Sequence, residues 1–81
     1  MARPLLQIAL DNNTLSDALK SISLVGNEVD VIEAGTILCL AEGMEAVRCL
    51  RALYPNKIIL ADTKCADAGT TVAKNCADAG A

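Results

Sequence analysis

The 81-residue sequence contains no histidine, no tryptophan and no phenylalanine, and its one aromatic side chain is Tyr54. Without an imidazole, this chain has no Ser-His-Asp triad, no histidine-based zinc site and no histidine general acid or base. With a single aromatic ring it has no base-stacking platform, and its core must be aliphatic. Basic residues are also few, seven against ten acidic ones. Nucleic acids and anionic membranes attract a basic face, so we expect no nucleic-acid partner.

The sequence also lacks long apolar runs. Glu33, Gly35 and Glu42 interrupt its longest apolar stretches, which predicts no membrane span and no membrane partner. The first ten residues lack the apolar region and cleavage site of a signal peptide. The four cysteines form no C-x-x-C pair, which disfavours a zinc knuckle or a thioredoxin motif and favours structural thiols in a reducing compartment. We therefore expect a cytoplasmic protein.

A hydrophobic content of 53% is sufficient for a packed core and excludes disorder. The apolar run LLQIAL predicts a strand at about 5–11, of the kind that is buried on both faces. Thr14, with Asp17 three residues later, has the pattern of a helix N-cap. Apolar residues then recur at helical spacing, which predicts a helix at about 15–25 that ends at Gly26.

The same order of elements occurs twice more. Further strands are predicted at about 29–34 and 57–62, and further helices at about 42–53 and 70–78. Strands that alternate with helices through short connections indicate an α/β fold with a parallel sheet and right-handed crossovers. Three βα units do not complete any common parallel fold. We therefore interpret residues 1–81 as the N-terminal part of a single (β/α)8 TIM-barrel domain, incomplete as written.

Each predicted strand ends with a carboxylate: Asp11, Glu33 and Asp62. Ligands bind at the carboxyl ends of parallel strands, and carboxylates on adjacent strands can share one hard cation such as Mg²⁺. Lys64 lies two residues after Asp62, so an extended backbone would point both side chains the same way. This pattern predicts a carboxylate–lysine cluster for a metal ion and an anionic substrate.

Simpler interpretations remain open for each of these residues. An aspartate after a strand, such as Asp11, is most often a turn or cap residue. Glu33 ends a buried apolar run and therefore needs either a cation or hydrogen-bond donors. The segment from Asp62 to Asp67 could be a solvated loop with a fortuitous charge pair.

Two segments resemble a known enzyme family. They are LQIALDNNTL and VDVIEAGTILCLAEGMEAVRCLRALYPNKIILADTKCADAG, which together extend from about Leu5 to Gly69. They are similar to the start of the 3-keto-L-gulonate 6-phosphate decarboxylases, a branch of the orotidine 5′-monophosphate decarboxylase superfamily. The motifs are [IV]-E-x-G-T, which contains Glu33, and D-x-K-x-x-D, which begins at Asp62. The segments GTILC and ALYP-x-K look more like the decarboxylases than the related 3-hexulose-6-phosphate synthases.

The resemblance implies a role for each candidate residue. Glu33 and Asp62 would be Mg²⁺ ligands, and Asp11 would contact substrate hydroxyls. Lys64 would lie against the metal and the developing enediolate and would position the substrate. Asp67 would reach across a homodimer interface into the partner's active site. The implied reaction is Mg²⁺-dependent decarboxylation of the sugar phosphate 3-keto-L-gulonate 6-phosphate to L-xylulose 5-phosphate, in L-ascorbate catabolism.

The resemblance also implies what these 81 residues lack. The family places its phosphate-binding groups and its proton donors on later strands, so we expect this chain alone to be inactive and poorly soluble. Two alternatives stay open: a 3-hexulose-6-phosphate synthase, or an inactive barrel fragment that pairs its open sheet edges in an oligomer. The sequence CADAG occurs at 65–69 and again at 76–80, and nothing in the sequence explains the repeat.

Overall fold

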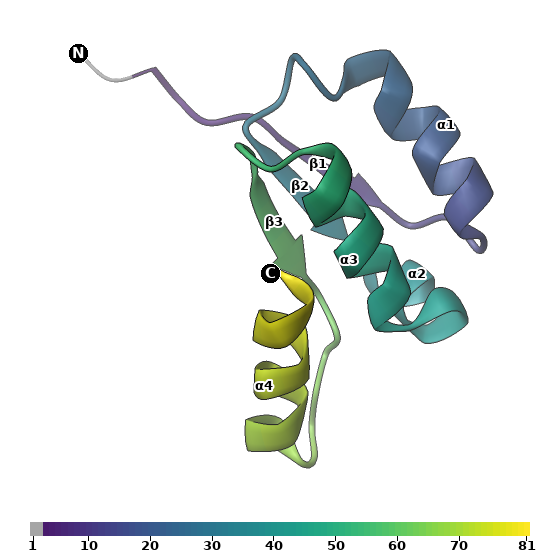
Figure 1. Ribbon diagram of the computed structural model, residues 1–81, viewed down its shortest axis with the longest axis vertical. Helices are drawn as coiled ribbons and strands as arrows, with labels where there is room; N and C mark the ends of the chain where they lie inside the picture. Colours follow the sequence, from purple (N-terminus) through teal and green to yellow (C-terminus); the bar gives the residue numbers. More distant parts are fainter. Residues whose placement is uncertain (1–2) are drawn as a thin grey trace.

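A computed structural model describes residues 3–81 as a three-stranded parallel sheet with four helices (Figure 1). The elements follow the chain in this order: β1 (Gln7–Leu10), α1 (Leu15–Val25), β2 (Val31–Ala34), α2 (Thr36–Glu42), α3 (Met44–Leu53), β3 (Ile58–Ala61) and α4 (Gly69–Ala79). The strand order is β1-β2-β3, and both pairs are parallel. The predicted α/β class and parallel sheet are confirmed. No helix within residues 3–81 is both long and apolar enough to cross a membrane.

The sheet is buried on one face only. Leu10, Ile32 and Ile59 point toward the helices and are at most 3% exposed. In Figure 1, α3 crosses over the strands, with α1 and α4 to either side of it. On the other face, Ile58 and Leu60 are 54% and 43% exposed. The prediction that the first strand is buried on both faces is wrong for β1, because Gln7 and Ala9 are exposed and nothing in residues 3–81 covers that face.

The first helix is capped as its sequence predicts. The Thr14 Oγ1 accepts a hydrogen bond from the Asp17 N–H at 3.1 Å, and the Gly26 N–H bonds to the Ile22 carbonyl. Gly26 is required for space rather than for its backbone angles, since a Cβ there would lie within 2.6 Å of the Tyr54 ring. The only aromatic residue of the chain therefore packs directly on a backbone turn.

The second helical region differs from the predicted single helix at 42–53. The predicted helix corresponds to α3, and an additional helix, α2, precedes it; the two are separated at Gly43, which has a φ of 66°. We did not predict α2, because TILCLAE begins with two β-branched residues and has no polar N-cap. Leu38 and Cys39 are buried in the core, so packing of this face determines the helical state.

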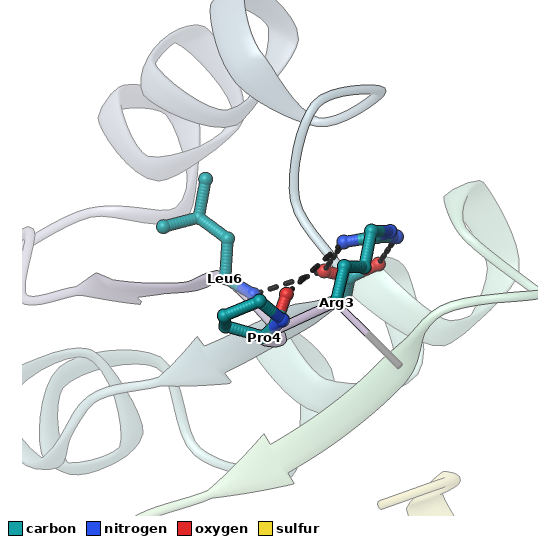
Figure 2. Close-up of polar contacts among 4 residues, drawn as sticks. Arg3, Pro4 and Leu6 are labelled. Carbon is teal, nitrogen blue, oxygen red and sulfur yellow. Dashed lines mark hydrogen bonds and ion pairs between the residues drawn. The ribbon is translucent and has the colours of Figure 1, made fainter. Parts of the chain in front are cut away.

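The start of the described chain is fixed to β2 by a charged contact (Figure 2). Both Arg3 guanidinium nitrogens donate to the Asp30 carboxylate, at 2.5 and 2.9 Å, and the Leu6 N–H donates to the same carboxylate at 2.9 Å. These donors hold the pKa of Asp30 well below its usual range, with the Arg3 hydrogen bonds as the main cause. The contact lies at the amino-terminal edge of the sheet, away from the candidate functional residues.

Arg51 connects α3 to two other segments. Its guanidinium donates to the carbonyls of Gly80, Pro55 and Lys57, at 2.8, 3.1 and 2.9 Å. Gly80 has a φ of 111°, and a Cβ on it would lie 2.7 Å from the Arg51 side chain. This close approach places the end of α4 against α3.

Candidate functional site

The candidate residues lie at the carboxyl edge of the open sheet face. Ala9 and Leu60 are the register partners of Glu33 on the two neighbouring strands. Asp11 and Asp62 each follow those partners by two residues, so all three carboxylates belong to the same face. Glu33, however, lies two residues deeper along the strands than the two aspartates. The site is therefore stepped, with one recessed carboxylate between two that lie at the rim.

Glu33 is half-buried within β2, and its hydrogen-bond donor is Gln7. The Gln7 Nε2 donates to the Glu33 Oε1 at 2.7 Å from the adjacent strand β1. We expected a partner for this carboxylate, and an amide supplies it in this structure. The second carboxylate oxygen of Glu33 has no protein donor among residues 3–81, which leaves it available to a ligand.

Asp62 and Lys64 form an ion pair directly after β3. The Lys64 Nζ lies 2.8 Å from the Asp62 Oδ2, and the Asp62 N–H donates to the Ala34 carbonyl at 3.0 Å. The lysine hydrogen bond is the main cause that lowers the pKa of Asp62, and the carboxylate in turn raises the pKa of Lys64. We predicted this pairing from an extended backbone, but Lys64 is left-handed with a φ of 46°. A turn, rather than strand alternation, therefore brings the ammonium to the carboxylate.

Asp11 completes the charged cluster from the end of β1. Glu33 and Asp11 both add to the raised pKa of Lys64, after the larger effect of Asp62. The Gly35 N–H donates to the Leu10 carbonyl at 3.0 Å, and a Cβ on Gly35 would overlap the Asp11 carboxylate. Three carboxylates around one ammonium give a local charge of 1 − 3 = −2 with all four groups ionised, which favours a cation at this edge.

The three carboxylates do not form a three-ligand metal site in the part of the chain that the structure describes. Among residues 3–81, no three His, Cys, Asp or Glu side chains come close enough together to hold a metal ion. The structure thus does not bring Asp11, Glu33 and Asp62 together on a single cation, because Glu33 is recessed. Glu33 and Asp62, on adjacent strands, still suit Mg²⁺, which takes hard oxygen ligands and usually binds one or two carboxylates plus water.

Asp67 is not part of the cluster in this chain. It lies in the exposed loop before α4, its Oδ1 accepts from the Ala68 N–H at 2.8 Å, and its carbonyl accepts from the Cys65 thiol. Ala68 has a φ of 55°, so the loop from Asp62 to Ala68 contains two left-handed residues that are not glycine. Such backbone strain is common where a loop carries functional groups.

Thr36 is a site residue that we did not predict. Its Oγ1 is buried and makes no well-formed hydrogen bond among residues 3–81, but a weak hydrogen bond from it adds to the lowered pKa of Asp62, after the larger effect of Lys64. In the sequence, Thr36 is only the last residue of the [IV]-E-x-G-T motif. The available signal was its place in the E-x-G-T motif, next to two residues that contact the site.

Residues 4–81 match the orotidine 5′-phosphate decarboxylase / HUMPS family. The 3-keto-L-gulonate-6-phosphate decarboxylase UlaD of Escherichia fergusonii is 54% identical over all 81 residues, which correspond to 38% of that protein. The crystal structure of KGPDC from Streptococcus mutans is 60% identical with a TM-score of 0.95, over 99% of this chain and 38% of the other.

A 3-hexulose-6-phosphate synthase from Salmonella typhimurium is also similar, with 40% identity and a TM-score of 0.91 over 96% of this chain and 37% of the synthase. Identity is thus higher to the two decarboxylases than to this synthase. The chain spans about 38% of the length of the curated relatives that it matches. Residues 4–81 cover nearly the whole sequence, and this chain belongs to the orotidine 5′-phosphate decarboxylase / HUMPS family.

Proposed function

We propose that the protein that contains this chain decarboxylates 3-keto-L-gulonate 6-phosphate to L-xylulose 5-phosphate. The observation that carries this proposal is the ion pair between Lys64 and Asp62, which lies beside Glu33 on the open face of the sheet. The chain that contains it is 54% identical to a 3-keto-L-gulonate-6-phosphate decarboxylase. Loss of CO2 from a β-keto acid leaves an electron pair on carbon, delocalised as an enediolate. A site for this reaction must stabilise negative charge where it develops.

Lys64 is the residue of this chain that supplies that stabilisation. Lysine is protonated at neutral pH, Asp62 raises the pKa of Lys64 further, and the ion pair with Asp62 places the ammonium beside the carboxylate. Asp62 and Glu33 would hold Mg²⁺, which when bound adds positive charge next to a substrate oxygen. Asp11, at the rim, would accept hydrogen bonds from substrate hydroxyls.

Asp67 has a different role in the proposal. Its exposed carboxylate, away from the cluster of its own chain, suits a homodimer in which it enters the active site of the other subunit. We also propose that the enzyme acts in L-ascorbate catabolism in the cytoplasm. Its phosphate-binding and proton-donating groups would come from parts of the barrel outside these 81 residues.

The test is an assay of CO2 release from 3-keto-L-gulonate 6-phosphate by the protein expressed at its natural length, with added Mg²⁺. Asp62→Asn and Lys64→Ala should each abolish most of the activity and leave the fold intact by circular dichroism. Lys74→Ala is the matched control, because Lys74 forms an exposed ion pair of similar length, 2.7 Å, with Asp78 on α4. Full activity in Asp62→Asn would refute the proposed role of the Asp62–Lys64 pair.

The synthase reaction is the second candidate, favoured by the 40% identity to a 3-hexulose-6-phosphate synthase. Formaldehyde-dependent condensation to a hexulose phosphate, measured in parallel, separates the two activities. An intact mass measured before either assay tests the third possibility. A mass near 8.4 kDa together with absence of both activities would identify an inactive barrel fragment.

A further inference from the structure

Gln7 is a polar residue on a strand that is otherwise apolar. It is the only polar side chain between Leu5 and Leu10, and in β1 it belongs, like Ala9, to the open face of the sheet. In a closed (β/α)8 barrel this face of the strands becomes the interior, which apolar side chains normally fill. A polar side chain at such a position destabilises the fold unless it is hydrogen-bonded. Gln7 therefore requires a polar partner on this face.

That partner is the Glu33 carboxylate on the neighbouring strand. The Gln7 Nε2 donates to the Glu33 Oε1 at 2.7 Å. Gln7 pairs in register with Val31, and Glu33 pairs with Ala9, so the hydrogen bond runs diagonally between β1 and β2. A long side chain is needed to cover this diagonal. Gln7 and Glu33 are also the only polar side chains that β1 and β2 place on the open face, and they bind each other.

The hydrogen bond leaves Glu33 with one fixed oxygen and one free oxygen. An ionised carboxylate only accepts hydrogen bonds, so the amide nitrogen of Gln7 is the group that must face it. The amide is neutral and therefore orients the carboxylate without cancelling its charge. Asp62 is held differently, because its partner is the Lys64 ammonium, which a bound cation would repel. The contact between Gln7 and Glu33 has no such conflict with a cation.

We propose that Gln7 is a positioning residue that prepares Glu33 for divalent-cation binding, by holding its Oε1 and leaving its Oε2 to the metal. The inference rests on the proposed function, in which Glu33 is a metal ligand. Hydrogen bonds from outer groups orient the carboxylates that bind a metal, and loss of such a group weakens metal binding by about ten- to a hundredfold. Gln7 acts through Glu33 and does not itself contact the metal.

The experiment measures Mn²⁺ binding, as a probe for Mg²⁺, by electron paramagnetic resonance on the protein at its natural length. Gln7→Met keeps the length of the side chain and removes the donor, and we expect its Kd for Mn²⁺ to rise by about tenfold. Gln7→Asn keeps the amide but is too short for the contact with Glu33. Its Kd should rise by a similar factor, and it keeps the test decisive if Gln7→Met does not fold.

Ile58→Met is the matched control. Ile58 lies in the same layer of the open face, since Val31 pairs in register with both Gln7 and Ile58. Its side chain has no hydrogen-bonding group, so Ile58→Met introduces the same residue into this layer without removing a donor from Glu33. We expect its Kd for Mn²⁺ to be unchanged.

The spectrum of bound Mn²⁺ distinguishes positioning from a general effect on the barrel. Its zero-field splitting depends on the arrangement of the ligands, so it should change in both Gln7 variants and not in Ile58→Met. An unchanged Kd or splitting in the folded Gln7 variants, or an equal rise of the Kd in Ile58→Met, would overturn the inference.

The same measurements separate this inference from the proposed function. If the unmodified protein binds Mn²⁺ but releases no CO2, the proposed reaction fails, and the Gln7 variants still decide the role of Gln7. If it releases CO2 and binds Mn²⁺ but the Gln7 variants behave identically, only the role of Gln7 fails. If the unmodified protein binds no Mn²⁺, the proposed metal site and the role of Gln7 fail together.

Discussion

Gly35 is the residue whose replacement tests the packing of the site most directly. Its φ of −69° and ψ of 165° are open to any residue, so alanine is not excluded by backbone strain. Space is the obstacle. A Cβ would lie 2.8 Å from the Leu10 carbonyl oxygen, a backbone atom that the Gly35 N–H itself holds at 3.0 Å, and would overlap the Asp11 carboxylate. The aspartate side chain can rotate away, but the carbonyl cannot move without disturbing β1.

Two opposing effects determine the size of the change in Gly35→Ala. Overpacking of this kind costs about 1 to 3 kcal/mol. Alanine also has less backbone freedom than glycine in the unfolded chain, which stabilises the folded state by about 0.4 to 1 kcal/mol. The difference lies between about 0 and 2.6 kcal/mol, and from the middle of both ranges we expect Gly35→Ala to lower the free energy of unfolding by about 1.3 kcal/mol.

Gly69→Ala is the matched control. Gly69 begins α4, and a Cβ there meets nothing within 4 Å. The same change in the unfolded chain, without a clash, should raise the free energy of unfolding by about 0.4 to 1 kcal/mol. Urea unfolding followed by circular dichroism measures both variants in the protein at its natural length. If Gly35→Ala proves as stable as Gly69→Ala, the close approach of Gly35 to Leu10 and Asp11 is refuted.

Three further predictions concern the fold around the site. Asp30 has a pKa below its usual range, so it stabilises the fold above the ordinary value of about 4 and loses this effect as the pH falls. When the free energy of unfolding is measured against pH, it should fall less steeply below about pH 4 in Asp30→Asn than in the original protein. Equal pH dependence in the two proteins would contradict the contact with Arg3. Arg51→Ala removes three hydrogen bonds to carbonyls and should lower the free energy of unfolding by about 2 kcal/mol. Amide hydrogen exchange should increase first in α4. Unchanged exchange in α4 would count against the contact with Gly80. Thr14→Ala removes the N-cap of α1 and should lower the free energy of unfolding, measured in urea, by about 1 kcal/mol. Thr14→Ser should lower it much less, and an equal decrease in both variants would argue against the cap.

The sequence predicted best where local chemistry alone decides the structure. The helix at Leu15–Val25 coincides with the expected 15–25, because Thr14 supplies a cap and Gly26 a stop within the same segment. The strands also occur within their expected ranges, each shorter by two or three residues. Thr36–Glu42 was missed because its helical state depends on burial of Leu38 and Cys39, which only tertiary packing provides.

The site shows the same division. The pairing of Asp62 with Lys64 was predicted from their spacing, but the left-handed backbone of Lys64 could not be, since lysine has no preference for that conformation. The repeated pentapeptide CADAG illustrates the limit. Its first copy forms a loop in which Ala68 is left-handed, and its second copy ends α4 at the left-handed Gly80. Identical residues adopt different structures because their surroundings differ.

Glu42 links the end of α2 to the start of α1. Its Oε2 accepts a hydrogen bond from the N–H of Leu15 at 2.6 Å, across 27 residues of sequence. The first turn of α1 is therefore completed by a side chain at the end of α2, in addition to its own Thr14. An isolated peptide of the first βα unit would have a frayed start of α1, and this turn becomes fully formed only after the second unit has docked. The start of α1 is thus stabilised by the second βα unit as well as by its own cap.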